Sequence, residues 1–135
     1  MQASENTEVK RRPTEVRMSL VEALDKAQLF QRTEDLVAAE SIYSEILEQI
    51  PEEPNATIFL GILRHQQGRS EEAIVLLRRA TELVPDEAGA WLNLGNVLIE
   101  IERFDQAAHA LRRSLELKPE SAAGFNNLGI AHLRC

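Results

Sequence analysis

Apolar residues recur along most of this chain every three or four positions, the spacing that places them on one face of an α-helix. A clear example has apolar residues at positions 91, 94, 97, 98 and 101. Short turns containing proline, glycine or charged residues separate such runs. The pattern predicts an all-α protein with about seven helices, at residues 20–32, 36–49, 55–67, 71–83, 89–101, 105–117 and 122–135.

Several of these helices carry start and stop signals. Ser19 stands three residues before Glu22, the arrangement of a capping box, in which each side chain bonds the other residue's backbone N–H. Ser70 precedes two glutamates and is expected to cap the fourth helix. Gly68 lies where the chain must turn between helices. A proline follows each second helix and prevents it from continuing: Pro51, Pro85 and Pro119.

The chain repeats itself with a period of 34 residues. The segment LRRATELVP at 77–85 matches LRRSLELKP at 111–119 in most positions. The pair Leu-Gly recurs at the same interval, at 60–61, 94–95 and 128–129. A period of this length is typical of stacked helical hairpins, in which each unit buries its apolar face against the next.

Residue size follows the same period. Glycine recurs on the first helix of each unit, at Gly61, Gly95 and Gly129. Alanine recurs on the second helix, at positions 39, 73 and 107. A small residue lets two helices approach closely while large neighbours fill the remaining space. We therefore expect all three glycines to lie at close contacts between helices.

These residues resemble the pattern of the tetratricopeptide repeat (TPR) family, in the order Trp91, Leu94, Gly95, Ala107, Leu111 and Pro119. The resemblance covers residues 18–135 as three full repeats, at about 20–53, 54–87 and 88–121, plus the first helix of a fourth at 122–135. It implies a right-handed α-solenoid of antiparallel helix pairs. Residues 1–17 are polar, and we expect them to form a disordered leader.

The resemblance also implies a protein–protein interaction scaffold without catalysis in the repeat itself. In this family the first helices line a concave groove, where a peptide or a helix of a partner protein binds. The candidate groove residues in this chain are Phe59, Ile62, Leu92, Asn93, Asn96, Asn126 and Asn127.

The asparagines allow two interpretations. Asn93 and Asn127 are similar to the asparagine ladder of O-linked N-acetylglucosamine transferase repeats, although Asp25 and Phe59 interrupt the series. An amide side chain both donates and accepts hydrogen bonds, which suits recognition of a peptide backbone. Alternatively, these asparagines form only a solvated surface, because asparagine is common at this place in the repeat.

The apolar candidates allow two interpretations as well. Phe59, Ile62 and Leu92 either form an exposed anchor for a partner or are covered by neighbouring helices or the leader.

One known type of TPR ligand is not expected. Domains that hold the acidic tails of heat-shock chaperones use lysine, asparagine and arginine at defined groove positions. The corresponding residues here are Leu24, Gln28, Phe59, Gly89 and Asn93, which lack the positive charges.

The composition of the chain disfavours some further classes of partner. The chain has 135 residues and a formal net charge of -7, which disfavours nucleic acid because phosphates attract basic surfaces. No apolar run approaches the length of a membrane span, and the N-terminus lacks the apolar core of a signal peptide. Cys135 is the only cysteine, which fits a reducing compartment. We therefore expect a cytoplasmic protein with a protein or peptide partner.

No catalytic, cofactor-binding or metal-binding residues are expected. The three histidines do not have the close spacing of metal ligands, and the sequence contains no phosphate-binding glycine loop or nucleophile elbow.

The last predicted helix carries Phe125, Leu128 and Ile130 but has no following helix to cover them. A terminal repeat normally presents a polar outer face. Either a second copy covers this end, as in a two-fold dimer, or the chain is a fragment. The fragment interpretation leads to an alternative function, an N-terminal substrate-presenting or dimerising module of a larger bacterial enzyme of the glycosyltransferase, sulfotransferase or methyltransferase type.

Overall fold

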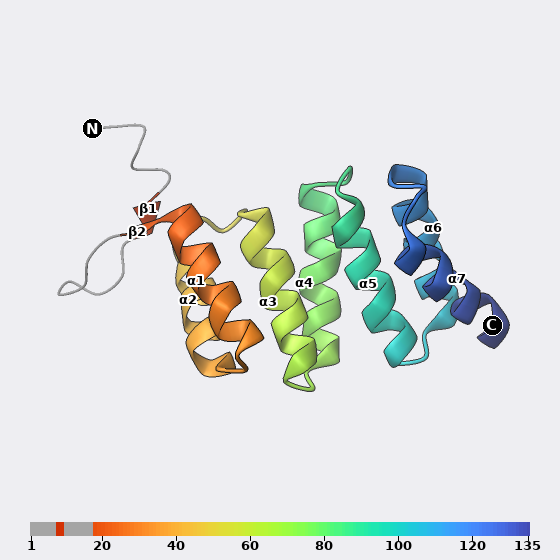
Figure 1. Ribbon diagram of the computed structural model, residues 1–135, viewed down its shortest axis with the longest axis horizontal. Coiled ribbons are helices and arrows are strands. Elements are labelled where there is room, and N and C mark those ends of the chain that lie inside the picture. The colour runs from red at the N-terminus through yellow and green to blue at the C-terminus, as the bar shows by residue number, and fades with distance from the viewer. Residues whose placement is uncertain (1–7, 10–17) are drawn as a thin grey trace.

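The computed structural model describes residues 8–9 and 18–135. Its described part contains seven α-helices, which pack as sequential antiparallel pairs in a row from α1 to α7 (Figure 1). Their bounds are α1 Leu20–Arg32, α2 Leu36–Gln49, α3 Pro54–Gln66, α4 Ser70–Leu83, α5 Ala88–Glu100, α6 Phe104–Leu117 and α7 Ala122–Arg134. The predicted all-α fold of stacked helical hairpins is confirmed, and each predicted boundary lies within one residue of the observed one.

The helix ends confirm one cap prediction and contradict another. Ser19 and Glu22 form the predicted capping box at the start of α1. Ser70, however, is the first residue of α4 rather than its cap, and the side chain of the cap residue Arg69 makes no capping hydrogen bond. The hydroxyl of Ser70 instead lies 3.0 Å from His65 Nδ1 on α3. The capping prediction was therefore wrong, because a contact between helices engages this hydroxyl.

The N-terminal segment adds a small feature that the sequence pattern did not predict. β1 Glu8–Val9 pairs antiparallel with β2 Met18–Ser19, immediately before α1. Two residues per strand are too few to show the alternation that identifies a strand in a sequence. The expected disorder of the rest of the leader, at 1–7 and 10–17, lies outside the described residues.

A left-handed backbone conformation recurs in the turn within each helix pair. Gly68 has a φ of 79° in the turn between α3 and α4. Glu34 and Glu102 hold the equivalent places, one period away, with φ of 65° and 63°. Residues other than glycine adopt this region at a cost, so the two glutamates are held there by the hairpin geometry.

Buried residues, mostly alanine, leucine and isoleucine, form the core between the helices, in one cluster around α1–α3 and another around α3–α7. Within a pair, the helices meet where a glycine faces a leucine. A β-carbon added at Gly95 would lie 2.6 Å from Cγ of Leu111, and one at Gly61 would lie 2.9 Å from Cγ of Leu77. Both leucines are fully buried. The prediction of close approach at these two glycines is confirmed.

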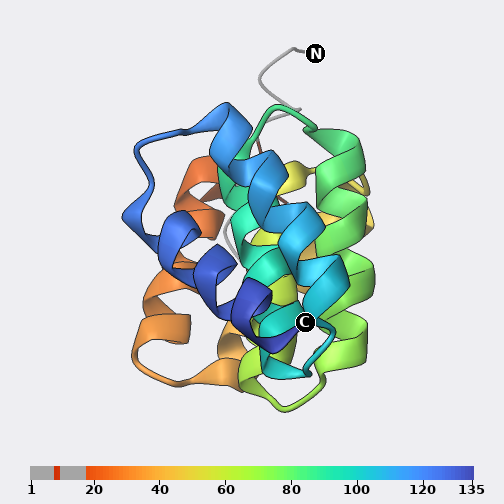
Figure 2. The same ribbon diagram turned by 90° about the vertical axis from the view of Figure 1, so that its right-hand side faces the viewer.

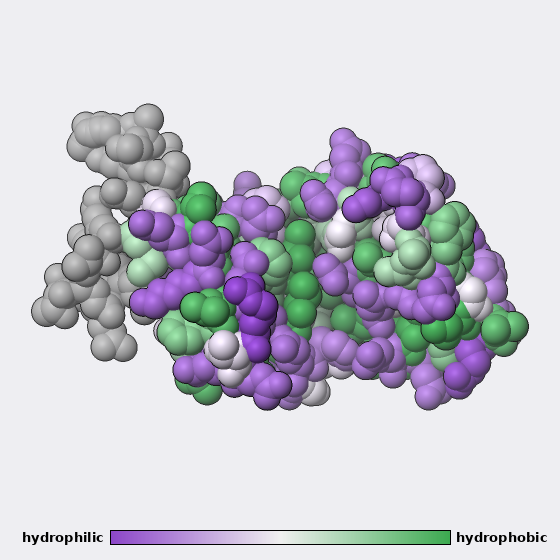
Figure 3. Space-filling view, in the orientation of Figure 1, coloured by the Kyte–Doolittle hydropathy of each residue, from purple (hydrophilic) through white to green (hydrophobic). Residues whose placement is uncertain are grey.

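The third glycine does not follow this prediction. A β-carbon at Gly129 would meet nothing within 4 Å, because no helix of the described part of the chain packs against this side of α7. Phe125 and Leu133 on the same helix are 59% and 85% exposed. Figure 2 looks directly at this end of the row, and Figure 3 shows hydrophobic surface near the C-terminus. The expected dimer through this face stays a prediction.

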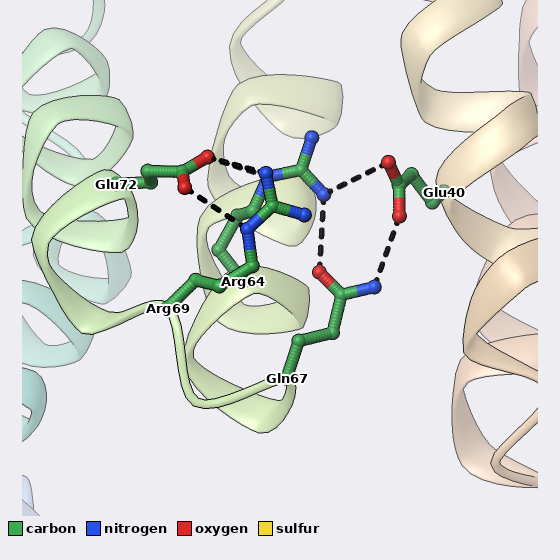
Figure 4. A network of polar contacts seen from close by, with 5 residues as sticks. All are labelled: Glu40, Arg64, Gln67, Arg69 and Glu72. Carbon is green, nitrogen blue, oxygen red and sulfur yellow. Dashed lines mark hydrogen bonds and ion pairs between the residues drawn. The ribbon is translucent and has the colours of Figure 1, made fainter.

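A polar network ties the first repeat to the second (Figure 4). Arg64, at the end of α3, lies 3.2 Å from Glu40 on α2 and 3.4 Å from Glu72 on α4. Gln67 donates to Glu40 at 2.9 Å, and Arg69 donates two hydrogen bonds to Glu72. Three helices are therefore linked by charged and amide side chains.

Gly95, which contacts a leucine, and Gly129, which contacts no other helix among the described residues, are expected to respond in opposite ways to the same substitution. We expect Gly95→Ala to lower the free energy of unfolding by about 1–2 kcal/mol. The new methyl group overlaps a buried leucine, and the cost of this overlap exceeds the gain in helix propensity. Gly129→Ala is expected to raise it by about 0.5–1 kcal/mol, since only the propensity gain applies. Urea unfolding followed by circular dichroism measures both. An equal effect of the two substitutions would contradict the packing described here.

The polar network leads to a pH-dependent prediction. The hydrogen bond from Gln67, together with the charge of Arg64, lowers the pKa of Glu40. A carboxylate with a lowered pKa stabilises the fold above its unfolded-state pKa of about 4.3, and this contribution disappears as the pH falls through the folded-state value. We expect Glu40→Gln to cost about 0.5–1 kcal/mol at pH 7 and close to nothing near pH 3.

Urea unfolding of both proteins at the two pH values measures the difference. Glu48→Gln, which changes an exposed glutamate on the same helix, is the control. A deficit for the Glu40 variant that persists unchanged at acidic pH would show that the carboxylate charge is not what stabilises this link.

Candidate functional site

The candidate site lies on the face formed by the odd-numbered helices, which we call the odd-helix face. Each helix pair is antiparallel and stacks on the next, so α1, α3, α5 and α7 are neighbours in space (Figure 1). A residue on α5 can therefore contact one on α7 although more than 30 positions separate them in sequence. All seven candidate residues are on α3, α5 or α7.

Three of the candidate asparagines form one hydrogen-bonded group. The side-chain amide of Asn127 donates to the carbonyl oxygen of Asn96 on the neighbouring helix. Asn126 donates to Asn127 at 3.4 Å. Asn96 and Asn127 also line a hollow of about 360 Å³ between α5 and α7. These two asparagines, predicted separately from the sequence, are thus brought together at one cavity.

Three further residues line this hollow and were not predicted. Ile99 and Glu100 come from the last turn of α5, and Ile130 comes from α7. Ile130 is 38% exposed, so its side chain is accessible. The hollow therefore combines amide groups, two apolar side chains and one carboxylate. The spacing of Asn96, Ile99 and Glu100 along one helix face was the signal that could have identified the α5 residues.

Asn93 is placed differently from the other asparagines. It is half-buried, and its amide donates a 2.9 Å hydrogen bond to the backbone carbonyl of Gly89 in its own helix. Part of its hydrogen-bonding capacity is therefore used within α5.

The apolar candidates are half-buried rather than fully exposed. Phe59 packs against the core cluster around α1–α3, and its ring stacks on that of Tyr43 with centroids 6.1 Å apart. Ile62 and Leu92 pack against the second cluster. A band of hydrophobic surface crosses the middle of the face shown in Figure 3. These side chains thus contribute to packing and also leave part of their surface accessible.

A polar contact that the sequence reasoning missed repeats along this face. Gln31 on α1 donates to Gln66 on α3 at 2.6 Å, and the buried hydroxyl of Tyr43 donates to Gln31 at 2.8 Å. One period later, His65 Nε2 lies 3.1 Å from the carboxylate of Glu100. Burial of the Tyr43 hydroxyl raises its pKa. In both contacts the partners are 35 residues apart, close to the repeat period, and this was the signal in the sequence. It identifies the partners only once it is known which helices are neighbours.

Comparison with known proteins agrees with this arrangement. The family model described as tetratricopeptide repeat matches residues 30–87 and again 64–126, together most of the chain. The chain belongs to the tetratricopeptide repeat family. In the terms of this family, the odd-numbered helices are the first helices of the TPR units, so the odd-helix face is the surface that sequence analysis assigned to the groove.

Solved TPR structures superpose on most of this chain. The O-GlcNAc transferase of Thermobaculum terrenum is 33% identical with a TM-score of 0.78 over 83% of this chain. The Sgt2 TPR domain from Aspergillus fumigatus is 18% identical with a TM-score of 0.79 over 84% of this chain and 76% of its own. The first TPR of Spaghetti (RPAP3) bound to the HSP90 peptide SRMEEVD is 16% identical, with a TM-score of 0.79 over 84% of this chain and 90% of its own.

This chain spans only 22% of the length of the O-GlcNAc transferase it resembles. A search of curated proteins found no significant match. Within residues 8–9 and 18–135, no helix has both the length and the apolar character needed to cross a membrane. The same part of the chain holds no cluster of three or more histidine, cysteine, aspartate or glutamate side chains suited to a metal ion.

Proposed function

We propose that this TPR domain is a protein–protein interaction scaffold, whose odd-helix face binds an extended peptide of a partner protein. The observation that supports it best is the joined pair of Asn96 and Asn127 at the edge of a hollow between α5 and α7. Hydrogen-bonding groups beside a cavity suit a ligand that has both a polar backbone and side chains.

The chemistry of this site favours a peptide backbone as the ligand. Each asparagine amide can donate to a peptide carbonyl and accept from a peptide N–H. The hydrogen bond between Asn96 and Asn127 holds both amides in position before a ligand arrives, which reduces the entropy lost on binding. The exposed edge of Ile130 offers an apolar contact for a ligand side chain.

Charge favours neutral or basic peptides over acidic ones. Glu100 lines the hollow, and the whole chain carries a net charge of -7. An acidic ligand would be repelled on approach, whereas a basic one would be attracted. The Spaghetti domain binds an HSP90 peptide, but at 16% identity that comparison supports the fold alone. We therefore propose a ligand class different from the acidic chaperone tails.

A second candidate function rests on the likeness to an O-GlcNAc transferase. The identity is 33% over 83% of this chain, and this chain corresponds to only part of that protein. We also propose, as the alternative, that the odd-helix face presents protein substrates to an enzyme to which this domain is joined. The native gene beyond the codon for Cys135 separates the two. An enzyme domain encoded there favours the alternative, and its absence favours the scaffold.

The scaffold proposal predicts the effect of removing the amides. We expect peptides selected from a random display library on the immobilised domain to bind the double variant Asn96→Ala, Asn127→Ala about tenfold to a hundredfold more weakly. The reason is the loss of two or more ligand hydrogen bonds worth about 1 kcal/mol each. Isothermal titration with a selected peptide measures the change.

Gln106→Ala is the matched control, since it removes an exposed amide from α6, which is not part of the odd-helix face. Thermal unfolding of both variants checks that the fold is intact. Binding that survives the double substitution at full strength would refute the assignment of the site to these asparagines.

A further inference from the structure

A second cavity lies on the other side of the row of helices, between α4 and α6 and across α5. It has a volume of about 520 Å³, within the range of sites for small organic molecules. Its floor is apolar and consists of Trp91, Leu94, Leu98 and Ala110. We call this cavity the cleft. It is distinct from the candidate peptide site, with which it shares no residue.

Two side chains that line the cleft are smaller than their counterparts in the preceding repeat. The repeat period pairs Thr81 with Leu47 and Ala110 with Leu76, each 34 residues earlier. Leu47 and Leu76 both pack against the first core cluster, at the corresponding place between α2 and α4. At the second place, the smaller threonine and alanine stand at these positions and line the cleft.

At the second place, Arg103 at the start of α6 pairs with Glu71 on α4, whereas a larger polar network occupies the first. Arg64 joins α2 to α4 there through Glu40 and Glu72 (Figure 4). One period later, Leu98 stands in place of Arg64, and Gln106 stands in place of Glu72. The two repeat boundaries therefore differ in their side chains: leucines and the ion pairs of Arg64 lie at the first, and a threonine, an alanine and a leucine line the cleft at the second.

The aromatic side chains that line the cleft are suited to an aromatic ligand. The Trp91 indole is held in place because its N–H donates to the backbone carbonyl of Pro85 at 2.9 Å. The ring of His109 packs edge-on against it, with centroids 6.4 Å apart. A fixed aromatic surface binds a second ring by stacking or edge contacts without first losing side-chain entropy.

The rim of the cleft is suited to a positive charge. Glu82 on α4 and Asp105 on α6 place carboxylates on both sides. Arg78 is also present, but its guanidinium donates to Gln106 at 2.5 Å. With two acidic side chains and one basic side chain, the rim adds to the negative charge of the whole chain. A cationic group on the ligand would therefore lie near two carboxylates and would also attract the aromatic faces.

We propose that the cleft binds a small aromatic molecule that carries a positive charge. The site is independent of the proposed peptide groove, and either can fail without the other.

Trp91 provides a direct readout, because it is the only tryptophan in the chain. The probes are 2-phenylethylamine, the uncharged 2-phenylethanol and the anion phenylacetate, which share one phenyl ring and differ in charge. The Trp91 indole N–H resonance is followed by NMR during titration of the full chain at neutral pH. We expect saturable shifts with the amine at concentrations on the order of 1 mM, and at least several-fold weaker binding of the anion.

Two kinds of variant test the assignment. The double variant Thr81→Leu, Ala110→Leu restores the side chains of the first repeat boundary and is expected to abolish the shifts. Val75→Leu enlarges an exposed side chain on α4 that does not line the cleft, and it is expected to bind normally. Glu82→Gln leaves the cavity volume unchanged and is expected to reduce the preference for the amine over the alcohol by several-fold.

Thermal unfolding of each variant shows whether it is folded. If the double variant Thr81→Leu, Ala110→Leu does not fold, Glu82→Gln still tests whether the cleft prefers a positively charged ligand. The absence of a saturable shift with the amine would overturn the proposal. It would also be overturned if the folded double variant still bound the amine, or if phenylacetate bound as tightly as the amine.

Discussion

The close contact between a glycine on one helix and a leucine on its antiparallel partner is the interaction on which this structure depends. At Gly61 and Gly95, the absence of a β-carbon lets the leucine of the second helix sit directly on the first. This contact brings α3 close to α4 and α5 close to α6, so these two pairs pack in the same way. The odd-helix face is a consequence, since identical hairpins in a row align their first helices.

The proposed binding sites lie where successive repeats differ. The core positions repeat, but the side chains between neighbouring repeats do not. Asn96 and Asn127 meet across α5 and α7, whereas His65 and Glu100 occupy the space between α3 and α5. On the opposite side, two leucines lie at one boundary, and a threonine and an alanine line the cleft at the next. A regular scaffold with irregular boundaries provides distinct surfaces without a change of fold.

The sequence was sufficient for the helices and their pairing because both follow from a local signal, the apolar spacing and the 34-residue period. It also led to Asn96 and Asn127 as candidate site residues, but it could not show that they bond each other. Ser70 was assigned wrongly because its hydroxyl interacts with His65 on a preceding helix rather than with its own helix end. The cleft was missed because its volume depends on residues from three helices, none of which is unusual by itself.

The left-handed turns have a consequence for how the chain folds. Glycine adopts this conformation at little cost, so the hairpin of α3 and α4, which turns at Gly68, closes more readily than its neighbours. The hairpins that turn at Glu34 and Glu102 must each force a side-chain-bearing residue into the same conformation. In a stack where each unit contacts only the next, the most easily closed unit is the natural nucleus. We expect order to begin in the middle of the molecule and to spread towards both ends.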